Sequence, residues 1–167
     1  MRRLYIRYIL ALIVAFSSNF FYTIFSPLTI YTTYFILSLF YNVTMTNSSI
    51  IFQDVTFSFI PACTAATAYL IITELILLTR GVSFKNILKF LYISYLSIFT
   101  MNILRILVLI YIYLNYGKNY FDAFHLVFWH ILSTIFVALV WIFLVEHFNI
   151  RGVPIYSDIK HLLKLKK

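Results

Sequence analysis

The chain has 167 residues, of which 63% are hydrophobic and 20% are aromatic, while only 11% carry a charge. This composition excludes an ordinary soluble domain and predicts an integral membrane protein. The net charge of +8 does not indicate a nucleic-acid partner, because the basic residues lie at the ends of apolar segments and form no basic stripe.

The first third of the chain predicts three elements. Residues 4–25 are long and apolar enough for a first membrane-spanning helix, which we expect to end at Ser26-Pro27, because a proline ring disfavours helical geometry at the preceding residue. Residues 28–41 are short for a span and carry several threonines, so they are interpreted as an interfacial helix on the outer face. The alternative is that they form a further span. Residues 42–60 contain β-branched and aromatic residues in partial alternation and predict a small β-hairpin outside the membrane.

Three further apolar segments follow. Residues 62–79 predict a second span of about 27 Å, close to the thickness of a bilayer core. Residues 86–116 predict a third span, whose length of about 46 Å requires it to tilt, kink or project beyond the membrane. After a polar loop at residues 117–122, residues 125–145 predict the last span. Residues 149–167 predict a basic cytoplasmic tail.

The positions of the basic residues predict the topology of this four-span protein. Eleven of the 13 lysines and arginines lie at the start of the first span, around the turn between the second and third spans, or in the tail. The positive-inside rule then places both termini in the cytoplasm and the hairpin outside. A fifth span over residues 28–41 would put Arg80, Lys85 and Lys89 on the opposite side from the N-terminal arginines. The predicted fold is therefore an all-α, multi-pass protein of the plasma membrane with one integral domain, residues 1–148.

Three polar residues converge at the outer membrane face in this topology. Cys63 lies at the outer end of the second span, and His125 lies at the outer start of the last span. Arg105 lies about 27 Å along the third span from its cytoplasmic end, which brings it to the same level. A thiol, an imidazole and a guanidinium at one level match the needs of a nucleophile, an acid or base, and a charge stabiliser. These three residues are the candidate catalytic group.

The guanidinium of Arg105 can serve this chemistry in two ways. Lowering the pKa of a thiol by about two units takes about 2.7 kcal/mol, and a guanidinium at about 4 Å supplies about 4 kcal/mol at an effective dielectric of about 20. The same group can instead stabilise a developing oxyanion while His125 transfers the proton. The sequence leaves both roles open, including which of the two residues handles the proton. Asn102 lies three residues before Arg105 on one helix face, so we expect it to orient the guanidinium.

Non-catalytic interpretations are compatible with the same residues. A lone cysteine in an apolar chain is often a small hydrophobic residue without chemistry, and buried arginines also occur where membrane helices assemble. The chain is then a small membrane scaffold or a subunit of a secretion or transport complex. No His-Glu-x-x-His motif occurs, no metal or cofactor is expected, and an intramembrane zinc or serine protease is not supported.

Several short motifs follow the predicted hairpin in a fixed order. They are PACTAA at residues 61–66, MNILRI at residues 101–106, and FHLVFWHILST at residues 124–134. Together, over residues 28–145, they resemble the exosortase and archaeosortase family of integral membrane cysteine transpeptidases. In this resemblance Cys63-Thr64-Ala65 corresponds to the family's cysteine element, Asn102 to Ile106 to its Asn-x-x-Arg-Ile element, and His125 to its final histidine or arginine.

The resemblance implies a sorting enzyme that acts on the outer face of the membrane. Such an enzyme cuts secreted proteins near a C-terminal signal made of a short motif, a transmembrane helix and a basic tail. It would hold the cut protein as a thioester on Cys63 and transfer it to an amine of a membrane lipid or glycolipid, with Arg105 and His125 assisting. Thr64-Ala65 stands where bacterial members commonly carry Ser-Gly, which favours an archaeal branch. Trp129 departs from the glycine that often follows the histidine by four positions, and the four predicted spans make the chain a short form.

Overall fold

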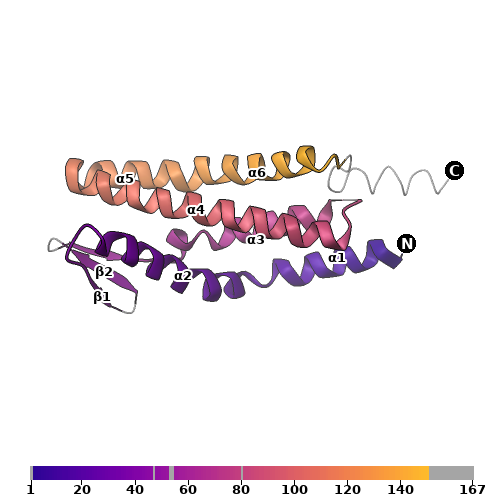
Figure 1. Cartoon of the computed structure of the whole chain (residues 1–167), viewed down its shortest axis with the longest axis horizontal. Coiled ribbons are helices and arrows are strands. Elements are labelled where there is room, and N and C mark those ends of the chain that lie inside the picture. The colour runs from indigo at the N-terminus through magenta and orange to yellow at the C-terminus, as the bar shows by residue number, and fades with distance from the viewer. Residues whose placement is uncertain (1, 47, 53–54, 80, 151–167) are drawn as a thin grey trace.

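The computed structural model describes residues 2–46, 48–52, 55–79 and 81–150. The described chain is mostly helical, as predicted, and forms an elongated bundle with a small β-sheet at one end (Figure 1). The N-terminus of the first helix and the C-terminal end of the last helix lie at the opposite end. Most of the predicted basic tail, residues 151–167, lies outside the described residues.

The N-terminal apolar region folds as two helices whose boundary differs from the prediction. Helix α1 covers Arg2–Ala15, and helix α2 covers Ser18–Ser38. Between them the hydroxyl of Ser17 donates to the carbonyl of Val14 at 2.6 Å. A side-chain hydrogen bond of this kind competes with continuation of the helix. The expectation of one helix over residues 4–25 is therefore wrong.

Helix α2 passes through Pro27 without ending there. The predicted helix end at Ser26-Pro27 and the separate interfacial helix over residues 28–41 are therefore wrong. A proline inside a helix removes one backbone hydrogen bond and costs about 3 kcal/mol. Packing offsets this cost, because α2 buries a face that includes Thr29 and Ile30 against the bundle. Tertiary burial rather than local propensity decides this helix.

The segment predicted as a hairpin forms a three-stranded antiparallel sheet in the order β1-β2-β3, with strands at Thr44–Thr46, Ser49–Phe52 and Val55–Ser58. The β-structure expected in residues 42–60 is confirmed, but its two-stranded form is wrong. The register leaves two residues in each connection, after Thr46 and after Phe52. Two-residue connections are the commonest in hairpins, so a segment of this length holds two of them.

The segment predicted as the second span begins with a short 3₁₀ helix. This helix, η1, covers Pro61–Thr64, and helix α3 covers only Ala66–Leu78. Between them Ala65 has a φ of 53°, in the left-handed region that a right-handed helix does not contain. The α-helical part of residues 62–79 is therefore shorter than predicted, about 20 Å at the usual rise per residue.

The third apolar segment forms helix α4, Phe84–Tyr116, without interruption. Helix α5 (Lys118–Val127), the π-helical turn η2 (Phe128–Leu132) and helix α6 (Ser133–His147) then follow one another directly. The loop predicted at residues 117–122 is wrong, since Gly117 alone separates α4 from α5. Its φ of 83° with an extended ψ is essentially restricted to glycine, and it turns the chain back along α4 (Figure 1).

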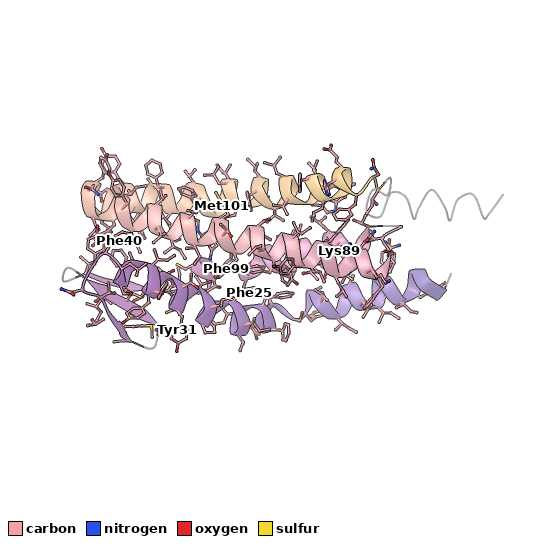
Figure 2. All side chains as sticks on the ribbon, viewed as in Figure 1. Phe25, Tyr31, Phe40, Lys89, Phe99 and Met101 are labelled. Atoms are coloured by element: carbon pink, nitrogen blue, oxygen red, sulfur yellow. The ribbon has the colours of Figure 1, made fainter. Side chains whose placement is uncertain are left out.

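Helices α2 and α4 are the two helices, within the described chain, that are long and apolar enough to cross a membrane. Shorter apolar helices lie at Tyr5–Ala15 within α1, in α3 and in α6. Large apolar side chains cover the outer surface of the bundle, including Tyr31 at 59% exposure and Phe40 at 74% (Figure 2). Exposed apolar surface of this kind is compatible with contact with lipid. The two long helices thus support membrane association.

Two clusters of buried side chains hold the elements together. The larger cluster joins α2, α3, α4 and α6 around Tyr69, Ile72 and Leu144. The second cluster, called the sheet cluster below, consists of Ile30, Leu37, Ile50, Phe59, Ile106 and Ile110. It contains residues of α2, the central strand β2 and α4, and Cys63 packs against it. The sheet is therefore fixed to the helices beside η1.

Candidate active site

The backbone around Cys63 has a conformation that separates it from α3. The N–H of Cys63 donates to the carbonyl of Ile60 at 2.8 Å, which closes the first turn of η1. Pro61 fits this position because its ring presets a helical φ. The left-handed residue Ala65 then redirects the chain into α3. Cys63 therefore lies on a short turn, and its side chain is partly buried.

The side chain of Asn102 anchors this turn to α4. Its Nδ2 donates to the backbone carbonyl of Cys63 at 2.9 Å, and Asn102 is only 4% exposed. Its Oδ1 is buried and has no hydrogen-bond partner within the described chain. A guanidinium only donates, so a direct bond from Arg105 would have to reach Oδ1. Asn102 therefore accepts no hydrogen bond from Arg105 at Oδ1 and holds the cysteine turn through Nδ2, while its role in orienting the guanidinium stays a prediction.

Cys63, Arg105 and His125 all line one cavity of about 200 Å³. They come from η1, α4 and α5, so three separate segments supply them. The convergence expected from the sequence is therefore found in the structure. Arg105 is 6% exposed, and its charge acts on both Cys63 and His125. The cavity walls are otherwise largely apolar.

Cys63 and His125 lie outside α2 and α4, and both have shifted pKa values. Burial raises the pKa of the Cys63 thiol, while the backbone hydrogen bond at Ile60 and the charge of Arg105 oppose this rise. Burial lowers the pKa of His125, the charge of Arg105 lowers it further, and Asp122 opposes both effects. The resting site at neutral pH thus contains a protonated thiol and a neutral imidazole beside a guanidinium.

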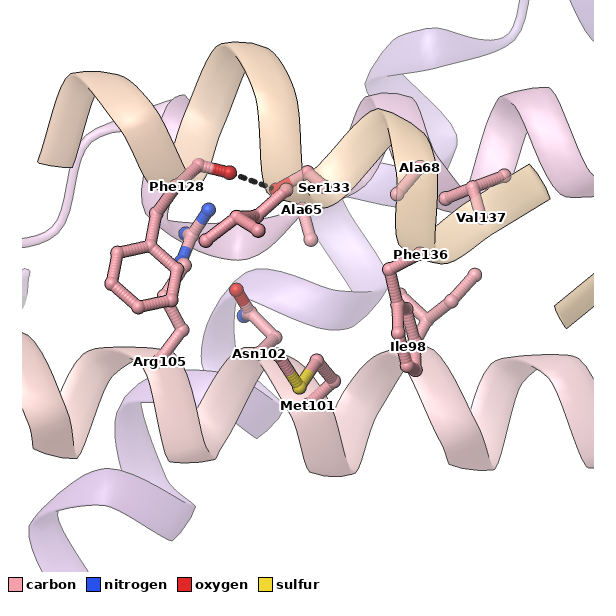
Figure 3. A pocket seen from close by; sticks show the side chains of 11 residues that line it. Ala65, Ala68, Ile98, Met101, Asn102, Arg105, Phe128, Ser133, Phe136 and Val137 are labelled. Atoms are coloured by element: carbon pink, nitrogen blue, oxygen red, sulfur yellow. Dashed lines mark hydrogen bonds between the residues drawn. The ribbon is translucent and has the colours of Figure 1, made fainter. Parts of the chain in front are cut away.

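Arg105 also lines a second, smaller cavity of about 30 Å³ on α4 (Figure 3). The amide of Asn102 points toward this cavity, and Ser133 lines it from the helix opposite. The hydroxyl of Ser133 donates to the carbonyl of Phe128 at 2.7 Å, across the π-helical turn η2. A cavity of this size has room for about two water molecules. The buried arginine therefore has polar neighbours on α4 and α6 as well as at the cysteine turn.

Strand β3 and Phe121 also line the larger cavity, which the sequence did not predict. Phe121 lay in the segment interpreted as a loop because of Gly117, Asn119 and Asp122. In the structure it is four residues before His125 on one face of α5, and their ring centroids are 5.6 Å apart. The four-residue spacing of Phe121 and His125 places both on one face only if the segment is helical. Because the segment was interpreted as a loop, this spacing was not used.

Comparisons with family models, with curated proteins and with solved structures find no match to this chain. The chemistry of the site therefore has to be derived from its residues and their contacts.

Proposed function

We propose that this protein is a membrane-embedded cysteine transpeptidase of the exosortase and archaeosortase type, which cleaves C-terminal sorting signals of secreted proteins. The observation that carries the proposal is the cavity shared by Cys63, Arg105 and His125. One thiol, one neutral imidazole and one buried guanidinium around a single cavity form a complete set for acyl transfer.

The first half of the reaction forms a thioester. His125 accepts the proton of the Cys63 thiol as Sγ attacks the carbonyl carbon of the scissile peptide bond. The new C–S bond gives a tetrahedral intermediate with a negatively charged oxygen. When the C–N bond breaks, His125 returns the proton to the leaving amine, and the C-terminal signal departs. The substrate remains attached to Cys63 as a thioester.

The second half transfers the substrate to an acceptor amine of a membrane lipid or another cell-surface molecule. The amine nitrogen attacks the thioester carbonyl, and a C–N bond forms as the C–S bond breaks. The amine gives up one proton to His125, which returns it to the sulfur of Cys63. The thiol and the neutral imidazole are then restored. Water in place of the amine would give hydrolysis by the same steps.

The shifted pKa values favour one of the two roles considered for Arg105. Because burial raises the pKa of Cys63, the resting thiol is protonated and no stable thiolate is required before attack. Because His125 is neutral, it can accept the proton during attack. The guanidinium is then best used at the developing oxyanion, where a buried positive charge acts in the transition state. Arg105 thus serves as the charge stabiliser and His125 handles the proton.

We place this chemistry at the outer face of a multi-pass protein of the plasma membrane, with both termini in the cytoplasm. Two features support this topology. Lys89 lies near the end of the bundle that holds the start of α1 and the end of α6, while the sheet lies at the other end (Figure 2). Lys85 and Lys89 lie in the first two turns of α4, close to the connection from α3, which the positive-inside rule then places in the cytoplasm.

A cleavage assay in cells tests the proposal. The protein is expressed with secreted reporters that end in a transmembrane helix and a basic tail, with randomised residues ahead of the helix. We expect a subset of reporters to lose the helix and tail with the wild-type protein and to keep them with Cys63→Ala. Thr100→Ala, which changes an exposed hydroxyl elsewhere on α4, serves as the matched control and should cleave the same reporters. Equal reporter processing with and without Cys63 would favour a scaffold or transport subunit.

A further inference from the structure

Strand β3 forms an edge of the sheet beside Cys63. The sheet order is β1-β2-β3, so β3 has a paired side toward β2 and a second side on which no strand of the described residues lies. An edge strand offers backbone N–H and C=O groups to another extended chain. Which backbone groups of β3 point to that side depends on the register of β3 with β2.

The register of β3 with β2 determines the direction of each backbone group of β3. The N–H of Phe59 donates to the carbonyl of Ser48 at 2.9 Å, which marks these two residues as a hydrogen-bonded pair. Hydrogen-bonded and non-hydrogen-bonded pairs alternate along antiparallel strands. Phe57 therefore bonds to Ile50, its partner in the register. The backbone groups of Thr56 and Ser58, the residues between, point away from β2.

The larger cavity runs along this edge. Its lining includes Val55, Thr56, Phe57, Ser58 and Phe59, which are consecutive in the chain. Side chains of successive residues in a strand point to opposite faces of the sheet, so one face of β3 would contribute only alternate residues. Because this cavity contacts odd- and even-numbered residues alike, it borders the edge of the strand and not one face of the sheet. The outward backbone groups of Thr56 and Ser58 therefore face the space that also contains Cys63.

We infer that the polypeptide substrate binds in extended form along β3, as a fourth strand, with its scissile bond at Cys63. This inference rests on the proposed transpeptidase function, because that function requires a peptide to pass through the cavity. Strand addition suits a sorting enzyme, since main-chain hydrogen bonds supply affinity and pockets for alternate side chains supply specificity. The outward N–H and C=O groups of Thr56 and Ser58 are the expected partners of alternate substrate residues.

The cavity walls identify the side chains that this substrate segment should carry. Phe57 packs edge-on against Tyr113 with ring centroids 5.2 Å apart, and Tyr113 in turn packs against Phe121 at 5.7 Å. Ile106 and Ile110 complete an apolar wall on α4. A strand directs every second side chain to one face. The substrate should therefore place an apolar side chain into this wall at one or two alternating positions.

Reactive peptides test the inference without knowledge of the natural substrate. Two probes carry related electrophiles: chloroacetone, which has no peptide part, and a mixture of tetrapeptide chloromethyl ketones with varied side chains. In both cases Sγ of Cys63 displaces chloride, so a C–S bond forms as a C–Cl bond breaks. We expect the peptide probes to alkylate Cys63 faster than chloroacetone. Methylation of one probe amide at a time should slow the reaction about fivefold per lost hydrogen bond, but only at alternate positions.

Two proline variants provide a matched test on the protein. Thr56→Pro removes an N–H that points out from β3, and the β2–β3 hydrogen bonds do not use it. Met45→Pro makes the same change at the other edge, because Met45 of β1 lies between hydrogen-bonded pairs in the register. Thr56→Pro should reduce the advantage of the peptide probes about fivefold or more, while Met45→Pro should leave it unchanged.

The outcomes separate this inference from the proposed function. If both variants react normally with chloroacetone, the site is intact and the peptide comparison is valid. One contrary result is that the peptide probes alkylate Thr56→Pro and Met45→Pro with the same rate advantage over chloroacetone. Another is that N-methylation slows the reaction equally at every position. Either result would contradict strand addition but not the thiol chemistry. Failure of chloroacetone itself to alkylate Cys63 in the wild-type protein would instead contradict the proposed nucleophile.

Discussion

The reactivity of Cys63 depends on a few residues with opposing effects. Burial disfavours the thiolate, whereas the backbone hydrogen bond at Ile60 and the charge of Arg105 favour it. His125 is the residue on this cavity that can accept a proton at neutral pH. The residue-scale account therefore predicts a thiol that is protonated at rest and is deprotonated as it attacks.

The first prediction concerns the pH dependence of thiol alkylation. Since burial raises the pKa of Cys63, the rate of alkylation by a small neutral reagent should still be rising with pH above the usual thiol pKa of about 8.5. Arg105→Met removes the positive charge that favours the thiolate, so its profile should shift to higher pH. Arg105→Lys keeps a charge and should shift it less. A profile unaffected by Arg105→Met would mean that the guanidinium does not act on Cys63.

The second prediction concerns Asn102. Asn102→Ala removes the donor to the part-buried Cys63 carbonyl, and we expect the free energy of unfolding in detergent to fall by about 1 to 3 kcal/mol. Because the cysteine turn is then less fixed, the alkylation advantage of the peptide probes should fall as well. Thr100→Ala on the exposed side of α4 should change stability by less than about 0.5 kcal/mol. Equal effects of the two variants would contradict the anchoring role.

The sequence predicted which three residues meet but not how their neighbours hold them. The meeting of Cys63, Arg105 and His125 was predicted from the positions of the basic residues and from the helical rise per residue. These two quantities determine at which level along a bundle a residue lies. Asn102 can bond to the Cys63 carbonyl because this carbonyl lies in η1, outside helix α3. The left-handed Ala65 separates the two, and an alanine gives no sequence signal for such a break.

At the scale of elements, the errors come from local signals. These signals predicted a helix end at Pro27, but packing of α2 against the bundle decided that segment. They also predicted a loop at residues 117–122, where Gly117 alone makes the turn and α5 begins at Lys118. The third β-strand was missed because its residues were interpreted as half of one hairpin. Long apolar stretches were predicted most accurately, as α4 shows. Element type was therefore more predictable than element boundaries, since boundaries depend on single turns such as Gly117.

The third prediction tests Gly117, the hinge between α4 and α5. Apart from its two chain neighbours, no heavy atom of the described residues lies within 4 Å of the position of a Cβ there, so a side chain would not clash with them. The φ of 83° with an extended ψ is nevertheless strained for any other residue, by about 1 to 3 kcal/mol. Gly117→Ala should lower the thermal stability accordingly and displace His125 from the cavity. Asn119→Ala, on the exposed surface of α5, should not; equal stability of the two variants would contradict the strain.

At the scale of the whole molecule, the arrangement separates a basic end from the end that carries the sheet and the cavity. Lys89 lies toward the first end (Figure 2), and helix α5, whose first residue is Lys118, lies toward the second (Figure 1). The described chain supports membrane association through α2 and α4. The number of spans could not be read from hydropathy alone, because α1, α3 and α6 are shorter than the bilayer core.

The fourth prediction tests the proposed orientation. In a Cys63→Ala background, Lys118→Cys should react with a membrane-impermeant maleimide in intact cells. Lys89→Cys, also exposed, should react only after the cells are permeabilised. This contrast follows from the positive-inside rule, which places Lys89 in the cytoplasm. Labelling of both positions, or the reverse pattern, would contradict the orientation.

The most direct test of the central claim is detection of the thioester on Cys63. A reporter that is cleaved in the assay above is co-purified with the protein, and the intact mass of the adduct is measured before and after treatment with neutral hydroxylamine. We predict a covalent adduct that contains the reporter without its C-terminal helix, disappears with hydroxylamine and does not form with Cys63→Ala. A reporter that is cleaved without any such adduct, or an adduct that persists in Cys63→Ala, would contradict the account.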